Sequence, residues 1–298
     1  MTTGLFVGLI TLDVIYLIPQ LPTANQKLVA RDYTIAAGGP ATNAAITFQY
    51  LEQNPRSNSR LIGVLGCHAL SQIVLADLQQ RAIDLIDLDP DSADPIPTSS
   101  ILVTEATGDR AVVSLNAMRS QIPADRLDPY PLDTLLQGIE VVLIDGHQMA
   151  ISHKIAQQAR AQRIPVVIDA GSWKPGFETV LPLADYVICS ANFYPPHCTT
   201  QADLFAYLQQ LGVPHIAVTH GAAPIEFCCS AQPNSIERGQ VPVPQHSVID
   251  TVGAGDIFHG AFCHFRRQAD FPTALHQAAQ VAAYSCRSFG TRAWMSKG

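Results

Sequence analysis

A thirteen-residue run near the C-terminus combines glycines and carboxylates at a spacing that suits phosphoryl transfer. The run, from Asp250 to Phe262, reads Asp-Thr-Val-Gly-Ala-Gly-Asp-Ile-Phe-His-Gly-Ala-Phe. Gly253, Ala254 and Gly255 separate an apolar stretch from an apolar-periodic one, which predicts a tight loop that opens a helix. The first N–H groups of a helix have no partner within it and carry partial positive charge. We therefore expect this loop to hold a phosphate or a developing anion.

Asp256 falls in the first turn of the predicted helix. There its carboxylate could accept the proton of an alcohol held beside the loop, as a general base does. A simpler interpretation is that Asp250 or Asp256 caps the helix and that the glycines only turn the chain. The length of the run favours the catalytic interpretation, in which the amides of Gly253, Ala254 and Gly255 stabilise the transferring phosphoryl group.

The run resembles the C-terminal signature of the ribokinase-like carbohydrate kinases, also called the phosphofructokinase-B (PfkB) family. That signature has the form Asp-Thr-x-Gly-Ala-Gly-Asp, and the match from Asp250 to Asp256 is complete. The family's N-terminal signature, Gly-Gly followed by Asn, is similar to Gly38-Gly39-Pro40-Ala41-Thr42-Asn43. The resemblance implies an enzyme that phosphorylates a sugar hydroxyl with ATP, with Mg²⁺ arriving on the nucleotide.

The same resemblance assigns substrate-side roles to residues in the first half of the chain. Asp13 matches the family's early sugar-binding Asp, and Gly39 and Asn43 match its substrate-side Gly and Asn. Asp145 follows an apolar strand and stands where relatives often place an acidic residue near the sugar or metal.

The sugar itself is predicted less directly. The N-terminal region looks most like the ketohexokinase and sulfofructose kinase branch, and Lys27 could offer its ammonium group to an anionic substituent. A solvated strand lysine is the alternative interpretation of Lys27. His147 stands where a sulfofructose-type site is expected to carry an arginine, and a neutral histidine holds an anion less firmly. We therefore expect a neutral ketose or a related sugar.

On the nucleotide side, the segment from Val218 to Gly221 resembles the family's Thr-x-Gly turn near ATP, through Thr219 and Gly221. Asn192 resembles the Asn of the family's Asn-x-x-Glu motif, but Pro195 replaces the Glu and Pro224 replaces a usual Gly. The missing Glu puts the family's water-mediated magnesium arrangement in doubt. Several relatives bind a monovalent cation beside the loop, so a dependence on K⁺ is a hypothesis for a set of matching or nearby positions: Asp250, Thr251, Ser285, Ser288 and Gly290.

Short β-rich runs alternate with helical patterns along the chain, which predicts an α/β fold with a mainly parallel sheet. The resemblance implies the three-layer α/β/α form of that fold. We expect strands at Leu5 to Thr11, Arg60 to Leu65, 141–144, 165–169, 186–189 and 215–219, and helices at 40–53, 71–81, 150–163, 201–211, 256–268 and 272–288.

Two stretches contain only β patterns: Lys27 to Ala36, and Ser99 to Leu115 with a Thr107-Gly108-Asp109-Arg110 turn. A polar, glycine-containing turn between alternating runs predicts a hairpin. In the resembled family such strands form a small lid sheet that covers the sugar and often pairs with a second subunit. We therefore expect one kinase domain over residues 1–298, lid strands inserted at about 14–37 and 97–118, and a homodimer through the lid.

Composition narrows the class of protein. With 298 residues, 47% of them hydrophobic and 14% charged, the chain can bury a large core. A net charge of −7 disfavours a nucleic-acid or anionic-membrane partner. The N-terminus lacks a basic region and a cleavage site typical of a signal peptide, so we expect a cytoplasmic protein. The seven cysteines include no C-x-x-C pair, and adjacent Cys228 and Cys229 are predicted on opposite faces of a strand.

Two other functions remain open. A nucleoside kinase would use the same fold and signatures, and would be favoured by an aromatic cleft in the lid, where Tyr16 and Tyr33 are the evident stacking candidates. A non-catalytic sugar- or nucleotide-sensing protein would keep the fold while Pro195 and Pro224 alter its chemistry. A Rossmann dehydrogenase is disfavoured because no Gly-x-Gly-x-x-Gly follows the first strand.

Overall fold

Two β-sheets organise the chain in the computed structural model, which describes residues 2–52, 58–115, 121–232 and 235–296. Within those residues the larger sheet has nine strands in the order β13-β12-β11-β10-β9-β8-β1-β4-β5. All neighbours from β5 to β11 are parallel, whereas β12 is antiparallel to β11 and β13 to β12. The strands are β1 (Thr2–Val7), β4 (Asn58–Gly63), β5 (Asp84–Asp87), β8 (Val141–Ile144), β9 (Val166–Ala170), β10 (Tyr186–Ser190), β11 (His215–His220), β12 (Ala223–Gln232) and β13 (Ser235–Val241).

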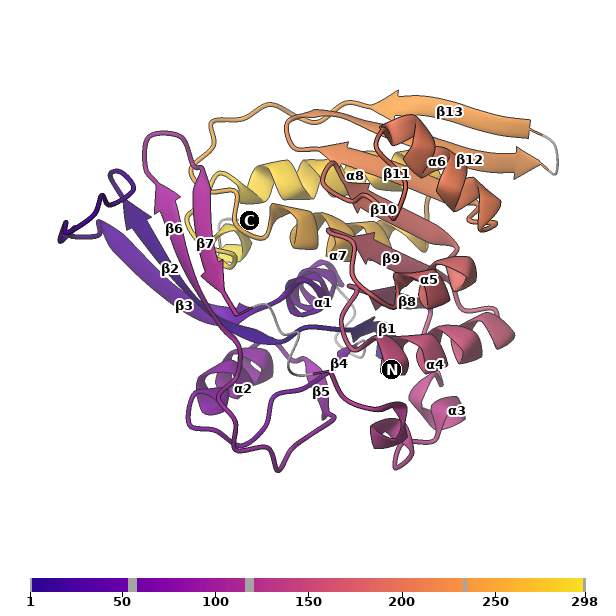
Figure 1. The fold of residues 1–298 in the computed structure, drawn as a ribbon, viewed down its shortest axis with the longest axis horizontal. Coiled ribbons are helices and arrows are strands. Elements are labelled where there is room, and N and C mark those ends of the chain that lie inside the picture. Colours follow the sequence, from indigo (N-terminus) through magenta and orange to yellow (C-terminus); the bar gives the residue numbers. More distant parts are fainter. Residues whose placement is uncertain (1, 53–57, 116–120, 233–234, 297–298) are drawn as a thin grey trace.

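Helices cover both faces of this sheet, so the architecture has three layers (Figure 1). One face is covered by α1 (Pro40–Leu51), α2 (Ser71–Gln80), α7 (Ala254–Arg266) and α8 (Phe271–Ser285), and the other by α3 (Leu132–Leu135), α4 (Met149–Ala161), α5 (Phe177–Val180) and α6 (Gln201–Gln210). Short 3₁₀ helices lie at Ala124–Leu127, Leu181–Leu183 and Ala293–Ser296. This arrangement confirms the predicted three-layer α/β fold.

The alternation of side chains along the strands explains the two helical layers. Phe6 packs with the α1 and α7 layer, whereas its neighbours Leu5 and Val7 pack with the α4 layer. All three are fully buried, as expected for a parallel sheet covered on both sides. Cys228 and Cys229 follow the same rule and lie on opposite faces, as predicted.

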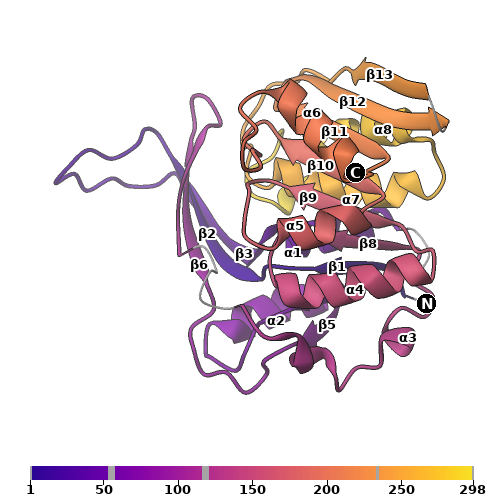
Figure 2. The same ribbon diagram turned by 45° about the vertical axis from the view of Figure 1, so that its right-hand side comes forward.

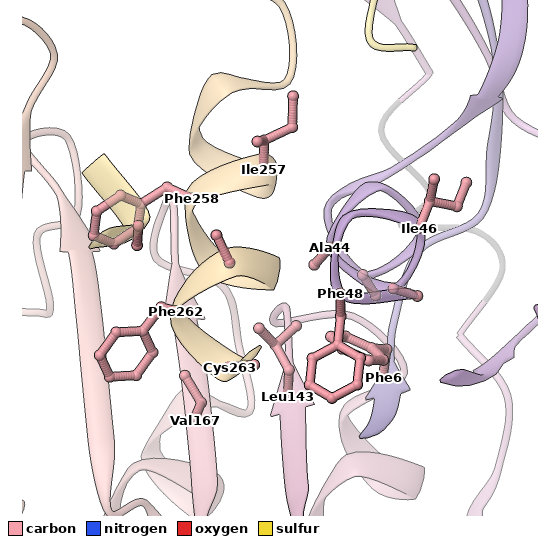
Figure 3. Packing of buried hydrophobic residues seen from close by; sticks show 14 of the residues in the cluster. Phe6, Ala44, Ile46, Phe48, Leu143, Val167, Ile257, Phe258, Phe262 and Cys263 are labelled. Atoms are coloured by element: carbon pink, nitrogen blue, oxygen red, sulfur yellow. The ribbon is translucent and has the colours of Figure 1, made fainter. Parts of the chain in front are cut away.

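Helices α1 and α7 pack closely against each other, and this contact positions the site. A Cβ placed on Gly260 would lie 2.3 Å from the Ala44 carbonyl oxygen, so only glycine permits this approach. Figure 3 shows Ala44 and Phe48 of α1 facing the α7 side chains Ile257 and Cys263. The first turns of the two helices therefore lie side by side.

The smaller sheet has the order β3-β2-β6-β7 within the described residues. Its strands are β2 (Thr11–Ile18), β3 (Asp32–Gly38), β6 (Thr98–Thr104) and β7 (Arg110–Ser114). Figures 1 and 2 show this sheet standing beside the α/β layers, at the end where α1 and α7 begin. We call it the lid sheet. Its inner face packs Ile15, Ile101 and Val103 against Val252, just before α7.

Several predicted boundaries differ from the structure. The apolar run Leu5 to Thr11 is not one strand, because β1 ends at Val7 and the chain crosses to the lid sheet before β2 starts at Thr11. Residues 27–31 precede β3 rather than joining it. Strand β5 and the β12–β13 hairpin were not predicted, and the predicted stretches at residue 53 and 116–118 lie outside the described residues. The β6–β7 hairpin is confirmed.

In the part of the chain that the structure describes, every helix is too short or too polar to cross a membrane.

Candidate active site

The strand order of the large sheet reverses between β1 and β8, and Asp145 lies at that point. Ligands of open α/β sheets commonly bind at such a switch point, outside the carboxyl ends of the strands. A Cβ on Gly8 would lie 2.0 Å from Asp145 Oδ1, so glycine is required there. Asp145 Oδ2 accepts hydrogen bonds from the backbone N–H of Leu9 (2.9 Å) and Ala41 (3.0 Å). Asp145 thus joins the end of β1 to the start of α1.

The other oxygen of Asp145 binds His147. Oδ1 accepts the backbone N–H of His147 at 3.0 Å and lies 3.1 Å from its Nδ1 atom. Burial alone would raise the pKa of Asp145, but His147 and the hydrogen bonds from Leu9 and Ala41 hold it below its ordinary value. Asp145 is therefore an ionised, fully occupied carboxylate, which suits it to fix backbone rather than to reach a ligand.

Asp13 and the Gly38-Gly39 pair lie on the inner side of the lid sheet. Asp13 Oδ1 accepts a hydrogen bond from Thr11 Oγ1 at 2.7 Å. Burial raises the pKa of Asp13, although hydrogen bonds from Thr11 and Ser99 oppose the change. Gly38 leaves room for Asp13, because a Cβ there would lie 2.0 Å from Oδ2. Gly39 is the N-cap of α1 with φ 100°, so both predicted glycines are required by geometry.

The predicted loop does open a helix, as α7 begins at Ala254 with Gly253 as its left-handed N-cap at φ 71°. Asp250 stabilises this loop, because its two oxygens accept the N–H groups of Val252 and Gly290, both at 2.8 Å. The Ala254 N–H donates to the Thr251 carbonyl at 3.3 Å. Among the described residues, no atom outside the helix backbone lies within 4 Å of an ideal Cβ on Gly255, so this side of the helix start is open.

Asp256 projects from this helix start toward α1. Asn43 Nδ2 donates a hydrogen bond to Asp256 Oδ2 at 2.8 Å. Burial raises the pKa of Asp256 to about 7, and the nearby Asp169 carboxylate adds to the increase while the Asn43 hydrogen bond opposes it. A base with a pKa near the working pH combines availability with proton affinity. The structure therefore brings the predicted Asn43 and Asp256 together.

Two buried residues beside Asp256 were not predicted as site residues. Asp169 lies near the carboxyl end of β9, and His259 lies one turn after Asp256 on α7. His259 Nδ1 lies 2.7 Å from the Gly255 carbonyl oxygen and 3.5 Å from Asp169 Oδ2. Burial raises the pKa of Asp169, and His259 opposes that change. Asp169 ends a predicted strand, so its place at the carboxyl edge could have identified it.

A cleft of about 430 Å³ extends from the start of α7. Asn192, Thr219 and Gly221, the three residues predicted on the nucleotide side, all line it, as do Ala254 and Gly255. Its remaining wall is largely apolar and includes Ile225, Val243, Phe258 and Ala279. Such a cleft suits a flat ring at one end and an anion at the helix start.

The lid contributes a cation to this cleft that sequence reasoning missed. Arg110, the first residue of β7, lines the cleft and donates from Nη1 to Thr251 Oγ1 at 2.9 Å. Thr251 Oγ1 in turn donates to the Gly108 carbonyl at 3.1 Å. These contacts dock the tip of the β6–β7 hairpin beside the α7 loop. Arg110 is a charged residue at the end of the predicted turn, and that position was the sequence feature that could have identified it.

Lys27 is exposed between β2 and β3 and is not part of this buried group. The described residues contain no cluster of three His, Cys, Asp or Glu side chains that could hold a metal by themselves. Asp169 and Asp256 are carboxylates near the helix start that borders the cleft, and such groups fit Mg²⁺ that keeps phosphate and water ligands. The positions predicted for a monovalent cation lie together, because the Asp250 N–H donates to the Cys286 carbonyl and Gly290 binds the Asp250 carboxylate.

Comparisons with known proteins identify the family of this chain. The family model described as pfkB family carbohydrate kinase matches residues 1–297. The chain is 22% identical to the ribokinase of Lactococcus lactis, over all of this chain and 95% of the relative. It is also 22% identical to the adenosine kinase of Schizophyllum commune, over 84% of this chain and 80% of the relative.

Solved structures share the fold. The ribokinase of Giardia lamblia superposes with a TM-score of 0.80 at 19% identity, covering 99% of this chain and 97% of its own. The ribokinase of Arabidopsis thaliana, solved with ribose and ATP, has a TM-score of 0.70 at 19% identity and covers 97% and 93%. Because the family model spans nearly the whole sequence, the chain belongs to the pfkB family of carbohydrate kinases.

Proposed function

We propose that this protein transfers the γ-phosphoryl group of ATP to a hydroxyl of a sugar, with a ketose or a related sugar as the acceptor. The observation that carries the proposal is the position of Asp256. Its carboxylate has a pKa raised by burial to about 7, and it projects from the helix start that borders the cleft. Base and anion site are thus adjacent, as phosphoryl transfer to an alcohol requires.

In this proposal Asp256 removes the proton of the acceptor hydroxyl. The N–H groups of Gly253, Ala254 and Gly255 would donate to the transferring phosphoryl group, and that of Ala254 would give up its long 3.3 Å contact with the Thr251 carbonyl to do so. Preorganised donors of this kind stabilise charge that develops in the transition state. Arg110 adds a cation from the lid, since its guanidinium lies in the cleft beside Thr251. Mg²⁺ would reach the site with ATP and neutralise phosphate charge.

Asp13, Gly39 and Asn43 would bind the sugar. Asp13 is a buried acceptor for hydroxyl protons on the lid side, and Asn43 hydrogen-bonds the base directly. Asp145 would act indirectly, because its oxygens already bind Leu9, Ala41 and His147. Lys27 would reach a substrate only if the segment between β2 and β3 moves inward, and an anionic substituent would favour that movement.

Asn192, Thr219 and Gly221 would hold the nucleotide, supported by their shared position in the cleft. The Arabidopsis ribokinase solved with ribose and ATP shows that this fold accommodates both ligands at once. A K⁺ ion would bind beside the α7 loop through carbonyls near Asp250, Thr251, Ser285, Ser288 and Gly290. Turnover that does not change when K⁺ is replaced by a larger organic cation would contradict the K⁺ site.

The lid sheet would be an insertion at about 14–37 and 97–118 in a single domain, and would also join two subunits. Its outer face, opposite Ile15, exposes Tyr33 and Val113 at 63% and 71%, and Tyr16 stacks on Tyr33 with centroids 6.2 Å apart. An apolar face of this kind is typical of an interaction surface. Light scattering should give twice the 32.1 kDa of one chain.

A nucleoside is the second candidate acceptor, supported by similarity to the Schizophyllum adenosine kinase. The lid tyrosines do not favour it. Ile15 faces Val252 on the inner side, so its neighbour Tyr16 points outward, away from the cleft of the same chain.

The test is ADP release from MgATP, with K⁺ present, across fructose, ribose, fructose 6-phosphate, sulfofructose, 2-keto-3-deoxygluconate and adenosine. We expect acceptor-dependent turnover with a sugar and its loss in Asp256→Asn. Turnover with adenosine alone would replace the sugar by a nucleoside. Binding of ATP and sugar without ADP release by the wild type would contradict the kinase and favour a sensor.

A further inference from the structure

A largely buried arginine near the C-terminus contacts the residue that binds the proposed base. Arg292 directly precedes the 3₁₀ helix Ala293–Ser296. Its Nη1 donates to Asn43 Oδ1 at 2.9 Å and its Nη2 donates to the Ala37 carbonyl at 2.6 Å. Its Nε lies 3.6 Å from Asp77 Oδ2 on α2. One guanidinium therefore connects α1, the end of β3 and α2.

The contact with Asn43 fixes the orientation of that amide. A side-chain amide has one acceptor and one donor end, and arginine can only donate. With Oδ1 held by Arg292, the amide must present Nδ2 to Asp256, as the 2.8 Å hydrogen bond shows. The reversed amide would place its oxygen against a carboxylate and its NH₂ against a guanidinium. Arg292 thus selects the orientation that supports the base.

The contact with Ala37 reaches the lid. The Ala37 N–H donates to Asp77 Oδ2 at 3.0 Å, and its carbonyl accepts from Arg292, so the Arg292–Asp77 pair holds both backbone groups of Ala37. Ala37 directly precedes Gly38, which packs against the Asp13 carboxylate. The same arginine therefore sets the base and the strand end that frames the predicted sugar-binding Asp13.

We propose that Arg292 is a positioning residue for phosphoryl transfer, which acts through Asn43 on Asp256. The inference rests on the proposed function, in which Asp256 is the base. It goes beyond that function because Arg292 lies outside both signatures.

The charges around Asp256 and Arg292 determine in which direction the loss of Arg292 should shift the pKa of Asp256. Asp256 is faced by Asp169 on β9, His259 on α7 and Asp13 on β2, besides the neutral Asn43. Arg292 is faced by Asp77 on α2, by Arg81 directly after α2, and by Asp13 and Asp256. Since Arg292 is a nearby positive charge, it favours the ionised form of Asp256, and its removal should raise the pKa of Asp256 further.

The experiment combines two Arg292 variants with a matched control. Arg292→Met removes charge and hydrogen bonds, whereas Arg292→Lys keeps the charge but lacks the planar fork that reaches Asn43 and Ala37 together. Arg267→Gln removes another largely buried arginine, which pairs with Glu52 and Glu140, both at 2.6 Å, at the opposite end of α7. The readouts are the titration midpoint of Asp256 by ¹³C carboxyl NMR, assigned with Asp256→Asn, and the kcat and KM of sugar phosphorylation.

We expect Arg292→Met to raise the Asp256 midpoint by about one to two pH units, because it removes a positive charge that only the Asn43 amide separates from Asp256. Arg292→Lys should raise the midpoint less than Arg292→Met does, because it keeps the charge but loosens the Asn43 hydrogen bond that lowers the pKa of Asp256. It should also displace the Asn43 side-chain amide resonance and lower kcat about 10-fold with little change in KM. Arg267→Gln should change neither midpoint nor kcat.

An unchanged Asp256 midpoint in Arg292→Met would overturn the inference. If that variant does not fold, an unshifted Asn43 amide resonance in Arg292→Lys would overturn it as well. Both readouts are independent of turnover. If the wild type is inactive but Arg292→Met still shifts the Asp256 midpoint, the proposed function would be wrong and the coupling between Arg292 and Asp256 would stand.

Discussion

The two ends of the candidate site are built differently. At the proposed acceptor end, Asn43 is buried and Arg292 is largely buried, and Asn43 hydrogen-bonds both Arg292 and Asp256. At the nucleotide end, Asn192 and Gly221 are exposed, and Thr219 is half-buried. Asn192 and Thr219 line an open cleft whose wall is otherwise largely apolar.

This difference indicates which end of the site determines the rate of the chemical step and which end determines nucleotide affinity. A titratable group changes its pKa when protein replaces water around it, so burial at the proposed acceptor end raises the pKa of Asp256 toward the range of a base. Neutral groups beside an open cleft retain water when no ligand is bound, and each adds only a modest hydrogen bond. We therefore expect substitutions at the acceptor end to change kcat and those at the nucleotide end to change the KM for ATP.

The largest effect should come from Asp256→Asn. Asparagine keeps the shape and can still bind Asn43, but it cannot accept the acceptor proton. Loss of a positioned base typically lowers the rate about 10²- to 10⁴-fold, so kcat in steady-state ADP release should fall by that order. Circular dichroism serves as the control for folding. Turnover within threefold of the wild type would show that Asp256 is not the base.

The same substitution should stabilise the fold at alkaline pH. The pKa of Asp256 is about 7 in the folded protein and about 4 when unfolded, so the folded state binds the extra proton between these values. Its contribution to the free energy of unfolding therefore falls as pH rises from about 4 to 7 and stays low above that. The melting temperature of Asp256→Asn should exceed that of the wild type at pH 8 but not at pH 4. Equal differences at both pH values would contradict the raised pKa.

Gly253→Ala should have the next largest effect. Its φ of 71° is left-handed, and a Cβ there would lie 2.8 Å from Thr291 Cγ2. The left-handed conformation costs about 1–2 kcal/mol for alanine, and the shift needed to relieve the contact would move the donors at the helix start. We expect kcat to fall roughly 10²-fold, as for loss of one oxyanion donor. Gly212→Ala is the control, since Gly212 is also left-handed at φ 82°, lies outside the cleft lining and has no neighbouring atom of the described residues within 4 Å of its ideal Cβ.

Substitution of two asparagines, one at each end of the site, should give the smallest effects and compare the two ends directly. Asn43→Ala should lower kcat about 10-fold, because it removes the hydrogen bond to Asp256 and leaves Arg292 without an acceptor. Asn192→Ala should raise the KM for ATP by less than about 10-fold and leave kcat unchanged. Initial rates at varied ATP and sugar separate the two. An exchange of these two patterns would mean that the roles of the two ends are reversed.

Much of the fold was predictable because its signals are local. Parallel strands appear as apolar runs, and α6 even carries a capping box from Thr200 to Asp203. The prediction of one strand from Leu5 to Thr11 was wrong because the chain crosses there from one sheet to the other. Asp145 packs against Gly8 at this crossing, and it is too distant in the sequence for a local pattern to show the contact. The short edge strand β5 has only partly buried residues, which gives no clear alternation.

The candidate site divides in the same way. The signatures predicted Asp256, Asn43 and the α7 loop, which the structure brings together. Arg110, His259 and Arg292 escaped prediction because each acts across a long sequence separation, 141 residues between Arg110 and Thr251 and 249 between Arg292 and Asn43. A charged residue after a turn or near a terminus is usually solvated, so pattern alone does not identify a buried or docked cation.

The most direct test of the central claim is the pH dependence of kcat/KM for the preferred sugar, in wild type and Asp256→Asn. The base must be deprotonated, so wild-type kcat/KM should rise tenfold per pH unit and level off near pH 7, where the pKa of Asp256 lies. The residual activity of Asp256→Asn should lack this limb. A limb of the same midpoint in the variant, or a flat wild-type profile from pH 5 to 8, would contradict the assignment of Asp256 as the base.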